Sequence, residues 1–274
     1  MSSATDQETH GGVSTASLNY AAELAAYSGR RRQVPVRNSF VRNDDPDELP
    51  PLARLLRRGG RGGAVPIKLY ISLIWRCSAP PFDTEISARK WAVLLDLPDP
   101  NSLGARRITT ALETLNDENL VNLEKRRGDS TTVTLREESG LGIKYSLPST
   151  KYKKTKDEDE KRHHQYFKVP FALWTDGHIQ QMSAPALAML LILLAERNRD
   201  GRPTWWSTEL FPARFNIAES ARSKGTRELV ERDLLFVGRQ SVSLSRNPSR
   251  TFVKERVRNT YTLIGDASIG ADED

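Results

Sequence analysis

Apolar residues recur at helical spacing in several separate stretches of the chain. Every third or fourth residue is apolar across residues 66–77, which predicts a buried helix. The same spacing predicts a short helix over 86–97 and a longer one over 103–120. The segment 183–198 contains the run ALAMLLILLA, which is half the length of a membrane span and therefore predicts a buried helix.

Other stretches alternate between apolar and polar residues, as strands do. The segments VNLEKRR and STTVTLRE stand on either side of a turn at Gly128-Asp129, which predicts a β-hairpin. Near the end of the chain, an amphipathic segment at Phe215–Val237 leads into a tail with strand alternation at Thr260–Leu263. The predicted fold class is therefore mainly α with small β-hairpins, an α+β fold.

The two halves of the chain repeat the same pattern. Residues 86–97 align with residues 206–217 without a gap, and after an insertion of PDPNS in the first half the register resumes. Each half is expected to run helix, short helix, turn, longer helix and hairpin. The matched pairs are Ser87 and Ser207, Trp91 and Phe211, Leu95 and Phe215, Leu115 and Leu229, and Leu120 and Leu234.

This order resembles the winged helix-turn-helix family of DNA-binding proteins. The segments Leu95-Asp96-Leu97 and Phe215-Asn216-Ile217 stand where that family has an apolar–Gly–apolar turn, so Asp96 and Asn216 replace the usual glycine. The resemblance covers about 66–136 and 167–264. It implies two winged helix-turn-helix domains in tandem, with double-stranded DNA as the partner.

Composition and charge suggest how the segments are organised. We expect a disordered N-terminal arm over 1–47 with a short helix near 21–27, a first winged-helix domain over 48–140, a charged linker over 141–165, a second winged-helix domain over 166–265 and an acidic tail over 266–274. The linker should be extended or weakly helical. His163 and His164 in the linker are expected to be a solvated pair, so no metal site is predicted.

In winged modules the third helix enters the major groove with its N-terminal half. The resemblance therefore implies that Arg106, Arg107, Thr109 and Thr110 in the first half contact DNA, and that Ser220, Ser223, Lys224 and Arg227 do so in the second. The hairpins add cations that would meet phosphates: Lys125, Arg126 and Arg127, then Arg239, Arg246, Arg250, Lys254, Arg256 and Arg258. The alternative is that these helix faces are ordinary solvated surface.

The charge balance agrees with an acidic partner. The chain of 274 residues has a formal net charge of +6, and arginine outnumbers lysine by more than two to one. Arginine suits phosphate and guanine, although a GC-rich genome would also favour it. The basic stretches 29–37 and 57–63 are either arms that touch a DNA backbone or solvated linkers.

Sequence motifs for catalysis are missing. The chain has no GxxxxGK[ST], GxSxG or HExxH motif and only four scattered histidines, so we expect a protein that is not an enzyme and has no cofactor. Cys77 is the single cysteine, which excludes an intrachain disulfide. Without a signal segment, the expected location is cytoplasmic and nucleoid-associated.

Three functions are compatible with a tandem winged-helix protein that is not an enzyme. The first is sequence-specific DNA binding in transcription regulation. The second is a replication initiator of a plasmid or mobile element that binds origin repeats, since some initiators also join two winged-helix domains in one chain. The third is a scaffold whose winged domains bind protein. The possible protein partners are a second copy of the chain and host replication or transcription proteins.

Overall fold

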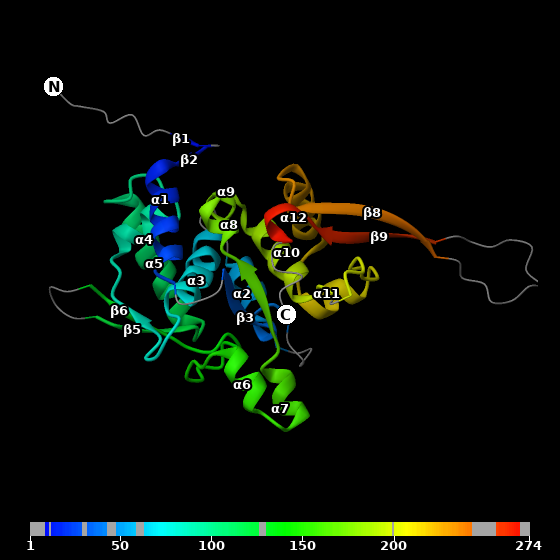
Figure 1. The fold of residues 1–274 in the computed structure, drawn as a ribbon, viewed down its shortest axis with the longest axis horizontal. Helices are drawn as coiled ribbons and strands as arrows, with labels where there is room; N and C mark the ends of the chain where they lie inside the picture. The colour runs from blue at the N-terminus through cyan, green and yellow to red at the C-terminus, as the bar shows by residue number, and fades with distance from the viewer. Residues whose placement is uncertain are drawn as a thin grey trace, which may run out of the picture.

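The computed structural model describes residues 9–10, 12–28, 32–42, 48–58, 63–125, 130–198, 200–242 and 256–268. Helices dominate, and the strands form small antiparallel sheets, so the predicted α+β class is confirmed (Figure 1).

The N-terminal segment is folded where it is described, so the expected disordered arm over 1–47 is wrong there. Its elements are β1 (Thr9–His10), β2 (Val13–Ser14), α1 (Thr15–Ala26), β3 (Gln33–Arg37) and the 3₁₀ helix η1 (Asn38–Phe40). The expected short helix at 21–27 is the second half of α1. A few apolar residues are enough to attach this segment to the core, because Val34, Val36 and Phe40 are all fully buried. Counting apolar residues could not reveal this.

The first repeat follows. Its elements are α2 (Pro51–Arg57), α3 (Ala64–Arg76), β4 (Asp83–Thr84), α4 (Ala88–Leu94), α5 (Leu103–Asp117), β5 (Val121–Glu124) and β6 (Thr132–Leu135). The three strands form one antiparallel sheet in the order β4-β6-β5. The helices and the hairpin predicted for this half are thus confirmed, and the short strand β4 is an addition.

The segment between the repeats is packed against the rest of the chain. It contains α6 (Pro148–Lys154), α7 (Glu158–His163) and β7 (Tyr166–Pro170). Strand β7 pairs with β3 from the N-terminal segment, and α6 also contacts β3. The residues of α7 are largely exposed, as expected for a charged stretch, but the expected linker over 141–165 also contains buried residues such as Tyr145 and His164.

The second repeat has the same order of elements as the first. It contains α8 (Ala172–Thr175), α9 (His178–Gln181), α10 (Ala184–Ala195), α11 (Leu210–Phe215), α12 (Glu219–Glu231), β8 (Leu235–Val242), β9 (Arg256–Leu263) and the 3₁₀ helix η2 (Gly265–Ala267). Thr204, just before α11, forms a β-bridge with Tyr261 of β9. This bridge corresponds to the pairing of β4 with β6 in the first repeat.

The pairs matched in the sequence have equivalent local geometry. The Leu120 amide donates to the Leu115 carbonyl at 2.9 Å, and the Leu234 amide donates to the Leu229 carbonyl at 3.0 Å. Ser87 caps α4 by accepting from the Lys90 amide, and Ser207 accepts from the Leu210 amide before α11. The predicted internal repeat is therefore confirmed as a repeat of structure.

The two repeats share a core, which differs from the two domains expected at 48–140 and 166–265. The buried apolar residues of both halves form one contiguous cluster, and α3 packs against α10. Helix α12 approaches α10 closely, since a Cβ at Gly225 would lie 2.3 Å from the Pro185 carbonyl oxygen. The two hairpins lie at opposite ends of the long axis (Figure 1).

Candidate nucleic-acid interface

Helix α5 has a buried face and an exposed basic face. Ile108, Ala111 and Leu115 are buried against the core, as the spacing predicts. The predicted contact residues Arg106, Arg107, Thr109 and Thr110 are all exposed. The Thr109 hydroxyl donates to the Ala105 carbonyl at 3.1 Å, which turns the polar end of this side chain back toward the helix. The side chains of Arg106 and Arg107 remain exposed.

Helix α12 exposes a similar set. The predicted residues Ser220, Ser223, Lys224 and Arg227 are exposed, while Gly225 and Leu229 face the core. The Ser223 hydroxyl lies 3.5 Å from Glu219 Oε1 in the preceding turn. Glu219 is the acidic residue of the first turn of α12, where it also favours the helix macrodipole.

Two arginines of the amphipathic segment do not belong to this exposed face. Arg222 is buried: its guanidinium carbon lies 4.4 Å from the Phe211 ring centroid, and Nη2 donates to the Tyr261 hydroxyl at 2.9 Å. Arg232 bonds Glu228 and Gln181. Both side chains therefore hold α12 to its neighbours. Apolar spacing alone cannot reveal the burial of Arg222, because a guanidinium can also pack against an aromatic face.

The cations left on the exposed faces are not neutralised by the protein. Among the residues that the structure describes, no carboxylate forms an ion pair with Arg106 or Arg107 on α5, nor with Lys224 or Arg227 on α12. Other basic residues nearby are paired, including Arg58 with Glu118 at 2.7 Å. The outer faces of the two corresponding helices therefore both carry positive charge that the described carboxylates do not pair.

The first hairpin offers less free charge than expected. Lys125 forms an exposed ion pair with Glu113 of α5, with Nζ and Oε1 3.1 Å apart, so it links the hairpin to the helix. Arg126 and Arg127 lie outside the described residues. Such an exposed pair is weak, of order 0–1 kcal/mol, so a phosphate could still replace Glu113 as its partner.

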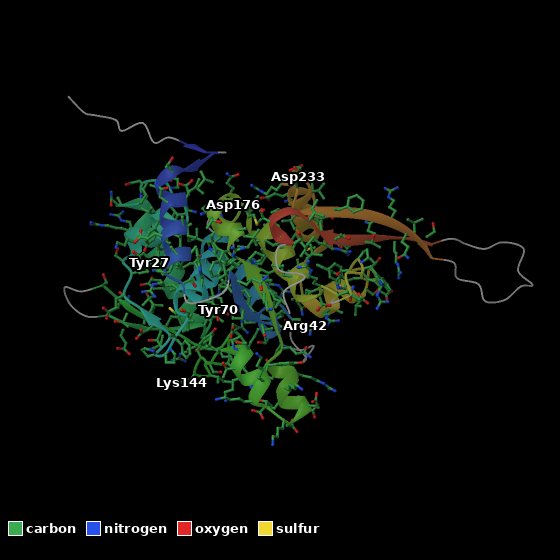
Figure 2. All side chains as sticks on the ribbon, in the orientation of Figure 1. Tyr27, Arg42, Tyr70, Lys144, Asp176 and Asp233 are labelled. Atoms are coloured by element: carbon green, nitrogen blue, oxygen red, sulfur yellow. The ribbon has the colours of Figure 1, made fainter. Side chains whose placement is uncertain are left out.

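The second hairpin extends away from the rest of the chain (Figures 1 and 2). Arg239 on β8 is exposed, and Arg258 on β9 stacks over Trp205 with its guanidinium carbon 3.8 Å from the ring centroid. Arg258 also donates to Gln240. The side chain of Arg256, together with Arg246, Arg250 and Lys254, lies outside the described residues. Trp206 is buried, whereas Trp205 is exposed.

Arg37, in the basic stretch 29–37, is buried inside the protein, so it is not placed to contact a DNA backbone. Arg37 is fully buried, with Nη1 2.6 Å from Glu138 Oε2 and Nη2 3.5 Å from Glu137 Oε2. Glu137 Oε1 in turn lies 2.6 Å from His163 Nε2. The expectation of a solvated histidine pair is therefore wrong, because His163 is bonded and His164 is buried.

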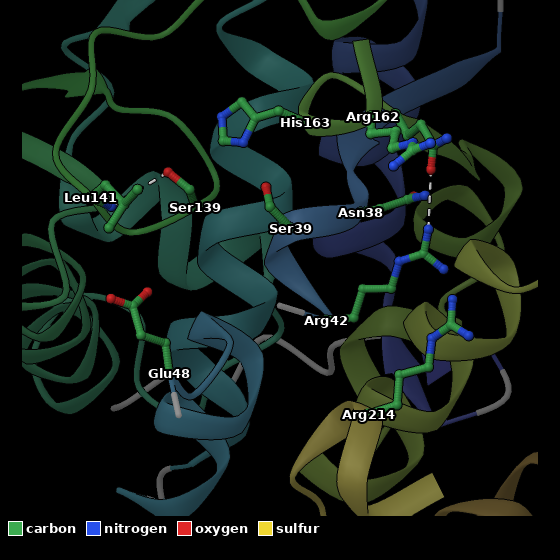
Figure 3. Close-up of a pocket in the computed structure, with 10 residues that line it drawn as sticks. Asn38, Ser39, Arg42, Glu48, Ser139, Leu141, Arg162, His163 and Arg214 are labelled. Carbon is green, nitrogen blue, oxygen red and sulfur yellow. Dashed lines mark hydrogen bonds between the residues drawn. The ribbon is translucent and has the colours of Figure 1, made fainter. Parts of the chain in front are cut away.

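A polar pocket lies beside this network. Figure 3 shows Arg42, Arg162 and Arg214 along one side of it and Glu48 on the other. The three arginines already form ion pairs within the protein: Arg42 and Arg214 both pair with Glu196, and Arg162 pairs with Asp159. We therefore attach no ligand to this pocket.

Comparison with known protein families, curated proteins and solved structures finds no match to this chain. In the described part of the chain, none of the helices has the length and apolar character needed to cross a membrane.

Proposed function

We propose that this chain binds double-stranded DNA through two winged helix-turn-helix modules and acts in transcription regulation. The order of elements supports the architecture. Each repeat has a long helix, a short strand or bridge, two further helices and a hairpin, and the hairpin strand nearest the C-terminus pairs with the short strand or bridge. In the winged modules that this order resembles, the third helix is the one that enters the major groove.

The observation that carries the proposal is the unpaired basic face of the third helix in both repeats. Arg106 and Arg107 occupy the first turns of α5, and Lys224 and Arg227 occupy the middle of α12. Guanidinium groups pair bidentately with guanine edges and with phosphates, and lysine binds phosphate as a point charge.

Selection of bound sequences from random duplex DNA tests the proposal directly. We expect the full chain to enrich a defined motif, and a salt titration on that motif to give a log–log slope steeper than about −4, because several phosphates release counterions. Weak binding with a flat salt response would contradict DNA as the ligand. A motif that recurs as iterated repeats beside the gene would indicate the replication initiator instead of the regulator.

A further inference from the structure

Three potential metal ligands from separate parts of the chain meet between the repeats. Glu137 follows strand β6, while His163 and His164 close helix α7. Each offers one ligand atom, and these atoms all lie within 4.8 Å of one another. The closest pair is Glu137 Oε1 and His163 Nε2 at 2.6 Å. The sequence places these residues 26 positions apart, so only the fold brings them together.

Neighbouring groups orient the carboxylate. The Arg37 guanidinium approaches the other oxygen, Oε2, at 3.5 Å, and the Ser139 hydroxyl contacts Oε1 at 3.4 Å. The charge of Arg37 is matched by Glu138, which lies 2.6 Å from its Nη1. Glu137 thus remains an anionic donor directed at the histidines, and metal-ligating carboxylates are typically hydrogen-bonded in this way by outer groups.

His164 lacks a partner that a buried imidazole normally has. Its Nδ1 is buried and has no hydrogen bond, while its Nε2 lies 3.9 Å from Glu160 Oε1. Buried polar atoms without a partner are rare and call for an explanation.

We propose that Glu137, His163 and His164 form a Zn²⁺ site, with Glu160 or water as the fourth ligand. Two imidazoles and a carboxylate are a ligand set that Zn²⁺ accepts at about 2.0–2.2 Å, whereas Mg²⁺ and Ca²⁺ prefer oxygen alone. Tetrahedral bonds of that length separate ligand atoms by roughly 3.3 Å. The ion would therefore widen the contact between Glu137 and His163 and draw His164 inward.

Such an ion would fix α7 to the end of β6 and, through Arg37, to strand β3. These are the elements that join the first repeat to the second. The site does not depend on DNA binding, and its test does not use DNA. Failure of one proposal would leave the other standing.

The experiment uses the untagged full chain after treatment with EDTA. Calorimetric titration with ZnCl₂ should show one ion bound per chain, and Zn²⁺ should raise the Tm, because a ligand that binds only the folded state stabilises it. MgCl₂ should do neither. The variants His163→Ala and His164→Ala should each weaken Zn²⁺ binding by at least about tenfold.

His178→Ala is the matched control. His178 also contacts a carboxylate, with Nε2 2.9 Å from Asp266 Oδ2, but it lies outside the cluster, so its loss should leave Zn²⁺ affinity unchanged. The Tm of each variant in EDTA checks the fold. If His164→Ala does not fold, His163→Ala decides the matter, because that side chain is partly exposed. Wild-type chain that binds no Zn²⁺, or full affinity in the folded variants, would overturn the proposal.

Discussion

Asp96 and Asn216 hold the same backbone conformation at the same place in the two repeats. Both are left-handed, with φ of 50° and 54°, and each follows the short helix that precedes the exposed basic helix. Asparagine and aspartate tolerate this region better than other residues with a Cβ. The two residues that replace the expected glycine therefore adopt the conformation that glycine would supply.

Replacing Asn216 tests this assignment. Asn216→Ala should lower the free energy of unfolding by roughly 1 kcal/mol, because the Cβ of alanine is strained in the left-handed region that glycine adopts freely. Asn216→Gly should be close to neutral. The measurement is equilibrium urea unfolding of the three proteins. Equal losses for alanine and glycine would mean that the side chain of Asn216, and not its φ, matters.

Arg37 should be essential for stability. Arg37→Met leaves Glu138 buried without its partner, which typically costs about 3–5 kcal/mol. Glu138→Leu alone should also destabilise, because it leaves Arg37 buried without that partner, whereas the double variant Arg37→Met with Glu138→Leu should lose less than the sum of the two single variants. Urea unfolding of the four proteins gives the coupling. Additive losses would argue against a direct charge pair.

The exposed arginines should affect DNA binding and leave stability unchanged. Arg107→Ala and Arg227→Ala should each weaken binding to the selected motif by about 1–3 kcal/mol if the residue contacts a base, with relaxed specificity at one position. A phosphate contact would instead weaken all sequences alike. Arg162→Ala on α7 is the control, since that exposed arginine lies away from α5 and α12 in sequence and pairs with Asp159. Unchanged binding in both helix variants would contradict the proposed interface.

Lys68 should make stability dependent on pH above neutrality. It is buried on α3 and donates to the Gln180 carbonyl at 2.8 Å. Burial lowers its pKa to about 8; the nearby charges of Glu228 and Asp96 oppose that shift, and Arg232 and Arg107 add to it. Because the unfolded chain keeps the proton up to its ordinary pKa of 10.5, the contribution of Lys68 to stability increases as pH rises from about 8 toward 10.5.

Comparison of wild type with Lys68→Met isolates this effect. Between pH 7 and 9.5 the free energy of unfolding of wild type should increase relative to that of the variant, by about 1–3 kcal/mol over the interval. Taking the difference removes other groups that titrate in both proteins. Parallel pH profiles would show that Lys68 has an ordinary pKa.

The repeat could be predicted because both halves space their apolar residues at the period of a helix, which places those residues on one buried face. Leu115, Leu120, Leu229 and Leu234 had to face inward for either repeat to pack, and they do. The exposure of α5 followed from the same pattern. The role of Arg222 did not, because its partners Phe211 and Tyr261 are distant in sequence.

The N-terminal segment shows a second limit of the sequence. Its strand β3 pairs with β7, which lies more than a hundred residues later in the chain. Amino-acid composition does not predict such a partner. The cluster of Glu137 with His163 and His164 has the same origin. Both features depend on contacts between residues that are far apart in the sequence, and the local pattern of apolar and polar residues does not predict such contacts.

If the chain binds DNA as proposed, the shared core restricts the spacing of the two half-sites that it can contact. Two modules on a flexible tether could reach half-sites at variable separations, but α3 packed on α10 and β3 paired with β7 give the two exposed helices one fixed offset. Duplex DNA rotates once in about 10.5 base pairs. A spacer lengthened by about 5 base pairs would turn the second half-site to the opposite side of the duplex, beyond the reach of a rigid pair, and one lengthened by a full turn would restore its phase but not its distance.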